Sequence, residues 1–159
     1  MPRRELRHGH QVADWLEQLG AGLNEPGKMI LIGSAALLWH AFDRGIQGEL
    51  PEASMVVDPI TDTEEIARVC YDCLIGSEFE REHGWHVNLM PELVLREFAP
   101  DWRDRAVLKS IGRLTLMVPS PEDLLRPKLR RGEPRDRKHW EWVRSIGLIG
   151  GDMRLDDGA

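Results

Sequence analysis

The chain has 159 residues, of which 42% are apolar and 30% charged, and its formal net charge is −6. This length and composition suit a protein with one core and exclude fibrous and disordered classes. The negative total argues against a protein whose whole surface covers nucleic acid or anionic lipid, because both require a positive face.

The longest apolar stretch, residues 29–42, is shorter than a membrane span. No apolar segment with a cleavage site follows the basic N-terminus, and two cysteines are too few for a disulfide framework. We therefore expect a cytoplasmic protein without membrane contact.

The first third of the chain predicts a helix, a strand and a second helix. In residues 10–23 the apolar side chains fall on one helical stripe: Val12, Trp15, Leu16, Leu19 and Leu23. The short apolar run at 29–32 predicts a central strand. Gly33 and Ser34 then open a helix over 35–42 that is apolar on nearly every side and therefore buried.

The middle of the chain predicts a loop, a strand and a helix. Residues 43–53 read as the loop, and 54–58 as a strand that Pro59 ends. Thr61 and Glu64 have the spacing of a capping box. The helix that follows has an apolar stripe of Ile66, Val69, Cys70, Cys73 and Leu74.

The last part predicts further strands and two helices. Residues 85–90 read as a strand, and 106–111 with 113–118 as a hairpin. Ser120 is a strong helix start, because a proline and an acidic residue occupy the first turn after it. A final helix is expected over 134–146.

Helices alternate with strands, but the late hairpin excludes a purely parallel sheet. We therefore predict an α+β fold with a mixed central sheet and helices mainly on one face. Residues 1–149 form a single domain in this prediction, and 150–159 form a flexible acidic tail. Six tryptophans are spread along the chain, which favours separate core anchors: Trp15, Trp39, Trp85, Trp102, Trp140 and Trp142.

Polar residues with functional potential follow the predicted strands. Gly33 permits close approach of a ligand to the backbone, and the free N–H groups of a helix start, with the Ser34 hydroxyl, favour an anion such as phosphate. A tight turn with Ser34 as N-cap explains the same pair without a ligand. Asp58 adds a carboxylate at the end of the next strand, and the strand after that offers His86 and Asn88.

In this order the motifs resemble the nucleotidyltransferase superfamily of the polymerase-beta type. The resemblance is nearest to the small branch related to toxins of bacterial nucleotidyltransferase toxin–antitoxin systems. Its residues are Leu31-Ile-Gly-Ser-Ala-Ala-Leu37, Ser54-Met-Val-Val-Asp58, the segment 120–129 with Lys128-Leu, and Arg135-Asp136. It implies a nucleotidyltransferase-like fold over residues 28–145.

The resemblance also implies transfer of a nucleotidyl group from a nucleoside triphosphate to a hydroxyl, with Mg²⁺ as cofactor. It assigns Asp58 as the catalytic residue and metal ligand, Asn88 as a metal ligand, and Gly33, Ser34, Lys128 and Arg135 to nucleotide binding. In the family, paired carboxylates on one strand and a third on a neighbour hold two Mg²⁺ ions. Here the first position is Val56 and the third is Asn88. A transferase with a degenerate metal site and an inactive protein that binds a nucleotide or a partner both stay open.

A basic segment lies near the C-terminus. Residues 124–140 contain seven basic and two acidic side chains, so this segment carries +5 and the rest of the chain −11. Such a patch suits a triphosphate, an RNA backbone or an acidic cognate protein, and it equally suits a solvated helix surface.

A second set of residues has the ligand types of a zinc site. Cys70 and Cys73 precede His83 and His86, but the two pairs are closer together than in a zinc finger. Both cysteines lie on the apolar stripe of their helix. We therefore expect them in the core, where a free cysteine behaves as a small apolar side chain.

Overall fold

The computed structural model describes residues 5–54 and 56–149, so the predicted acidic tail at 150–159 lies outside the described residues. Within those ranges, none of the helices has the length and apolar character needed to cross a membrane.

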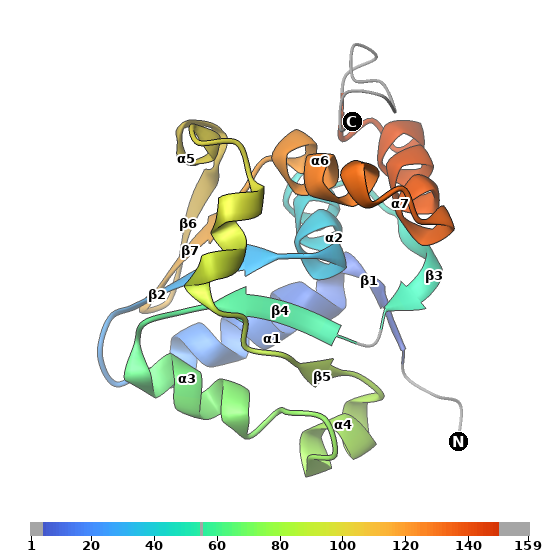
Figure 1. The fold of residues 1–159 in the computed structure, drawn as a ribbon. Helices are drawn as coiled ribbons and strands as arrows, with labels where there is room; N and C mark the ends of the chain where they lie inside the picture. The colour runs from blue at the N-terminus through green and yellow to red at the C-terminus, as the bar shows by residue number, and fades with distance from the viewer. Residues whose placement is uncertain (1–4, 55, 150–159) are drawn as a thin grey trace.

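A five-stranded sheet forms the centre of the fold (Figure 1). In spatial order its strands are β5 (His86–Val87), β4 (Val56–Ile60), β2 (Gly27–Ile32), β7 (Leu114–Val118) and β6 (Val107–Ile111). β2 pairs antiparallel with β4 and parallel with β7, while β7 and β6 form the predicted hairpin. The predicted α+β class with a mixed sheet is confirmed.

The helices α1 (Gly9–Gly22) and α2 (Ser34–Asp43) pack against each other behind this sheet (Figure 1). Met29 and Leu31 of β2 are almost completely buried, whereas Ile30 between them is only partly so. Because side chains alternate along a strand, Met29 and Leu31 face the helices. The opposite face of the sheet carries Ile30 and its neighbours, and we refer to it as the open face.

Further helical elements lie at the edges and in front of the sheet. They are α3 (Glu64–Tyr71), α4 (Glu78–His83), the 3₁₀ helix η1 (Glu92–Glu97), α5 (Trp102–Arg105), α6 (Pro121–Arg131) and α7 (Pro134–Ser145). α6 begins at the predicted cap, where the Ser120 hydroxyl accepts a hydrogen bond from the Asp123 backbone N–H at 3.1 Å. α6 and α7 pack together, and η1 passes in front of β2 (Figure 1).

The predicted loop at 43–53 is wrong in its second half. β3 (Glu49–Ser54) pairs antiparallel with β1 (Leu6–His8) in a separate two-stranded sheet. Leu6 and Leu50 are both fully buried in this small sheet. Neither strand has a strong strand pattern of its own, and the pairing between distant segments decides their structure.

Pro59 does not end its strand, as the sequence predicted, because β4 continues to Ile60. Pro59 lies opposite Leu31, and its carbonyl accepts a hydrogen bond from the Met90 N–H at 2.8 Å on the side away from β2. A residue's N–H and C=O point to the same side of a strand, so proline removes no donor from the ladder with β2.

Two other local predictions are also wrong. The N-cap of α3 is Thr63 and not Thr61, whose hydroxyl donates to the Lys28 carbonyl at 2.6 Å. The strand predicted at 85–90 is reduced to the two residues of β5, although the backbone N–H groups of Asn88 and Met90 still donate hydrogen bonds to carbonyls of β4.

The predicted core anchors are confirmed. All six tryptophans are buried, with exposed fractions between 2% for Trp102 and 9% for Trp142. Cys70 and Cys73 are also buried in the core, and burial raises the pKa of the Cys70 thiol to about 12. Both cysteines therefore act as apolar core residues, although Cys73 lies beyond the end of α3 and not on the predicted helical stripe.

Candidate functional site

The turn between β2 and α2 brings the predicted phosphate-binding residues to the end of the central strand. Gly33 is the N-cap of α2, with φ 79° and ψ −166°, and Ser34 is the first helical residue. Ser34 is thus not the N-cap that the alternative without a ligand required. At this φ and ψ, glycine is essentially the one residue tolerated.

Asp58 lies directly against this turn. Its position in the β4 register, opposite Ile32, places it beside the end of β2. A Cβ atom added to Gly33 would lie 2.6 Å from Asp58 Oδ2. Glycine is therefore required here for two reasons: it tolerates this backbone conformation, and it has no Cβ that would clash with the Asp58 carboxylate.

Asn88 adjoins Asp58 on the other side. The Asn88 backbone N–H donates to the Val57 carbonyl at 2.8 Å, and its side-chain amide donates to Asp58 Oδ1 at 3.5 Å. Burial raises the pKa of Asp58, while the Asn88 hydrogen bond and nearby positive charges act in the opposite direction. The structure thus brings together the two residues that the sequence predicted as metal ligands.

The two basic residues predicted for nucleotide binding are Lys128 of α6 and the exposed Arg135 of α7. Both exert a positive electrostatic influence on Asp58. Lys128 Nζ lies 3.5 Å from Nδ1 of the buried His139. Burial lowers the pKa of Lys128 to about 8, opposed by the carboxylate of Asp136 and that of Asp58.

Asp136 and His139 are two residues of this site that were not predicted. Asp136 is 1% exposed; its Oδ1 accepts a hydrogen bond from Arg131 at 2.7 Å, and its Oδ2 has no partner among the described residues. The sequence could have indicated this pair, because residues three apart on a helix lie on the same face, and Asp136 and His139 have this spacing on α7. A buried face of this kind on a very polar helix indicates a polar site.

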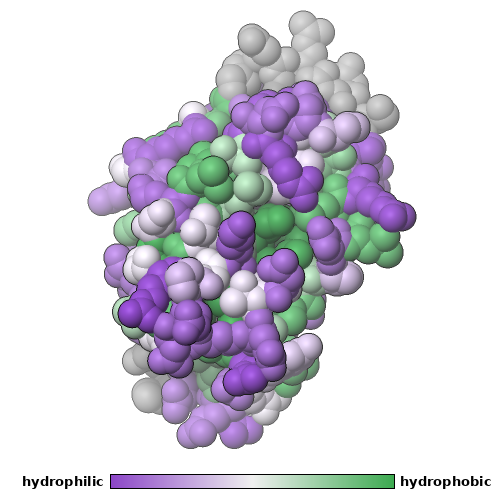
Figure 2. Space-filling view, turned by 90° about the vertical axis from the view of Figure 1, so that its left-hand side faces the viewer, coloured by the Kyte–Doolittle hydropathy of each residue, from purple (hydrophilic) through white to green (hydrophobic). Residues whose placement is uncertain are grey.

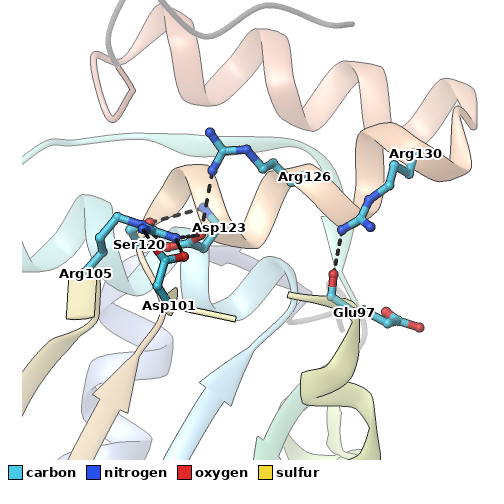
Figure 3. Close-up of polar contacts among 7 residues, drawn as sticks. All are labelled: Glu97, Asp101, Arg105, Ser120, Asp123, Arg126 and Arg130. Atoms are coloured by element: carbon cyan, nitrogen blue, oxygen red, sulfur yellow. Dashed lines mark hydrogen bonds and ion pairs between the residues drawn. The ribbon is translucent and has the colours of Figure 1, made fainter. Parts of the chain in front are cut away.

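A network of charges fixes the position of α6 (Figure 3). The fully buried Asp123 carboxylate accepts hydrogen bonds from Arg105 at 2.7 and 2.9 Å and from the Ser120 hydroxyl at 2.7 Å. Two turns further along α6, Arg130 donates to the Glu97 carbonyl at 2.6 Å. α6 is therefore held to both α5 and η1, and Lys128 lies between these two attachments.

A groove of about 720 Å³ lies on the open face of the sheet. Its apolar side chains include Ile30, Ile60 and Met117, and its charged lining consists of two basic and two acidic residues: Lys28, Arg103, Asp62 and Glu92. Asp58 and Ile60 point to the same side of β4, so the groove continues from the site along the sheet. Figure 2 views the molecule from the left-hand side of Figure 1 and shows apolar surface between hydrophilic side chains.

The arrangement suits an anion better than a metal ion. Within the described ranges, no three His, Cys, Asp or Glu side chains gather closely enough to hold a metal ion. This includes the possible zinc ligands Cys70, Cys73, His83 and His86. By contrast, the start of α2 after Gly33 offers backbone N–H groups, and two cations, Lys128 and Arg135, act electrostatically on the adjoining Asp58.

Comparison with known proteins gives one family and one structure. The model of a family described as "Nucleotidyltransferase of unknown function (DUF6036)" matches residues 10–152. The solved structure of an antigenic nucleotidyltransferase-like protein from Paracoccidioides brasiliensis is 14% identical, covers 97% of this chain and 87% of its own, and has a TM-score of 0.49. A likeness of that size adds nothing to the family match. No curated protein matches the sequence.

Proposed function

Because this chain belongs to the family of nucleotidyltransferases of unknown function (DUF6036), we propose that it binds a nucleotide at the turn between β2 and α2. The phosphate groups lie against the backbone N–H groups at the start of α2. The contact between Gly33 and Asp58 carries this proposal, because it places a strand-end carboxylate beside a turn that a ligand can approach closely. Lys128 and Arg135 support it with positive charge.

The bound nucleotide is transferred slowly or not at all. Nucleotidyl transfer to a hydroxyl needs metal ions that activate the attacking oxygen and bridge the phosphates. Of the three positions that carry carboxylates in the related transferases, only Asp58 is acidic, since the others are Val56 and Asn88. A transferase that retains one Mg²⁺ on Asp58 and Asn88 is the competing hypothesis, and it follows from the same family membership.

The nucleoside part, or an acceptor in the transferase hypothesis, lies in the groove of the open face. The groove adjoins Asp58 through Ile60, and its apolar floor suits the flat surface of a base. Its two basic and two acidic lining residues offer hydrogen-bonding groups of both charges to the polar atoms of a nucleoside or an acceptor.

Labelled ribonucleoside triphosphates, Mg²⁺ and total RNA test the function directly. We expect saturable nucleotide binding with little label in RNA or protein. Robust label transfer that disappears in Asp58→Ala and persists in Asp14→Ala, an exposed acid of α1, would favour the transferase and overturn the inactive reading. Absence of nucleotide binding would overturn the proposal as a whole.

The resemblance to toxins adds a second proposal, which concerns the partner. We propose that the partner is an RNA or a cognate protein that binds the basic residues within 126–138 on α6 and α7. Induced expression in a bacterium is expected to arrest growth, and co-expression of the neighbouring reading frame to restore it. Unimpaired growth at high expression would contradict a toxin role.

A further inference from the structure

The donor set around Asp58 does not fit two magnesium ions. Val56 offers no oxygen at the first metal position, and Asn88 directs its amide nitrogen toward Asp58 Oδ1 at 3.5 Å. Mg²⁺ is held by oxygen ligands in octahedral geometry, and its protein ligands are mainly carboxylates. One carboxylate therefore stands where a two-metal site requires three.

The charges around Asp58 also oppose a divalent cation. In the described part of the chain, the charges that act on Asp58 come from Lys128, His86 and Arg135, and each lowers its pKa. Counting −1 each for Asp58 and Asp136 and +1 each for Lys128, Arg135 and Arg131, which pairs with Asp136, these five groups carry +1 even with His86 neutral. A net positive site repels a metal ion and attracts a phosphate group.

Lys128 has the position that this role requires. Both Asp58 and Asp136 act on its charge, and Asp136 is already paired with Arg131 at 2.7 Å. Lys128 forms no direct ion pair within the described ranges, and its closest polar contact there is His139 at 3.5 Å. The network on Asp123 (Figure 3) holds α6, the helix that carries Lys128, so the backbone of Lys128 is in place before a ligand arrives.

We propose that this site binds the phosphate groups of a nucleotide without a divalent metal ion, with Lys128 and Arg135 supplying the positive charge that Mg²⁺ supplies in two-metal transferases. This inference rests on the proposed nucleotide-binding function. It reverses the role of Asp58: where a metal is bound, the carboxylate holds the metal, and here its negative charge opposes the phosphate. Neutralising Asp58 therefore strengthens binding, whereas in a metal site it abolishes binding.

Calorimetric titration of the full chain tests this inference, with each of the four ribonucleoside triphosphates and with inorganic tripolyphosphate as probes. Each titration is made in EDTA and in excess Mg²⁺. We expect dissociation constants in EDTA that are equal to or lower than those in Mg²⁺. Asp58→Asn is expected to bind about two- to tenfold more tightly in EDTA, and Lys128→Met at least about tenfold more weakly.

Matched control variants distinguish the effect of a substitution at the site from the effect of a change in net charge. Asp14→Asn and Lys109→Met change the same charges on the exposed surface and should leave affinity unchanged. Lys128→Arg, which keeps the charge, should retain most of the affinity and shows that loss in Lys128→Met is not a folding defect. Val56→Asp adds a carboxylate two residues before Asp58 and should weaken binding in EDTA.

The outcomes are distinct. Binding that requires Mg²⁺ and is lost in Asp58→Asn would overturn the metal-free inference and leave nucleotide binding intact. No binding of any probe, in EDTA or in Mg²⁺, would overturn the proposed function instead. Binding of tripolyphosphate in EDTA that is insensitive to Lys128→Met would place the phosphates elsewhere and also overturn the inference.

Discussion

Replacement of Gly33 by alanine tests the contact on which the site depends. The residue has φ 79° and ψ −166°, a conformation that costs a non-glycine residue about 1–3 kcal/mol. The new Cβ would lie 2.6 Å from Asp58 Oδ2, well inside an ordinary contact of about 3.4 Å. Crowding of this kind costs about 1–3 kcal/mol more. The sum predicts a loss of roughly 2–6 kcal/mol in the free energy of unfolding.

A double-mutant cycle separates the two causes. Asp58→Ala removes the oxygen that the Cβ would meet, so Gly33→Ala should then cost only the backbone strain. We expect a coupling of at least about 1 kcal/mol, which corresponds to roughly 2–4 °C in Tm for a chain of this length. Gly45→Ala is the matched control, because Gly45 has φ 70° and no atom within 4 Å of an added Cβ.

Urea denaturation of the four variants measures the coupling. If Gly33→Ala costs the same free energy with and without the Asp58 carboxylate, the close contact does not constrain this turn. The reasoning that links Gly33 to Asp58 would then be refuted.

Three further predictions concern charge and packing. Burial lowers the pKa of Lys128 to about 8, so above that pH the unfolded chain binds more protons than the folded one. The free energy of unfolding should therefore rise by about 1 kcal/mol from pH 8 to 9, relative to that of Lys128→Met. Equal pH profiles of the two proteins would contradict this. Burial raises the pKa of Asp58, so its charge destabilises the folded state at neutral pH, and Asp58→Asn should raise the Tm; a lower Tm would show that the carboxylate is favourably paired. Asp123→Ala should lower the free energy of unfolding by about 1.5–3 kcal/mol in denaturation experiments, because a fully buried carboxylate with charged hydrogen bonds is lost. Replacement of the exposed Asp14 by alanine should change the same free energy by less than about 0.5 kcal/mol.

Several elements were determined by the local sequence alone. The apolar run before Gly33 predicted β2 and the buried α2, and Ser120 with its first helical turn predicted the start of α6. The tryptophans and cysteines were recognised as core residues by their spacing. Each of these signals acts within a few residues, so neighbouring side chains are enough to decide the structure.

Other features were decided by the tertiary structure. β3 exists because β1 pairs with it from more than forty residues away. Pro59 stays inside β4 because its missing N–H faces away from β2, a matter of strand order that no local pattern contains.

The site likewise combines features that the local sequence determined with features that the tertiary structure decided. The sequence by itself determined which residue types stand at Gly33, Asp58 and Asn88, and hence that two of three expected carboxylates are absent. Only the packing of α6 against α2 and α7 decided that the charge of Lys128 acts on Asp58, seventy residues away in the chain. Electrostatic influence depends on distance in space and on burial, and for this reason a chain with net charge −6 can hold a site of net positive charge.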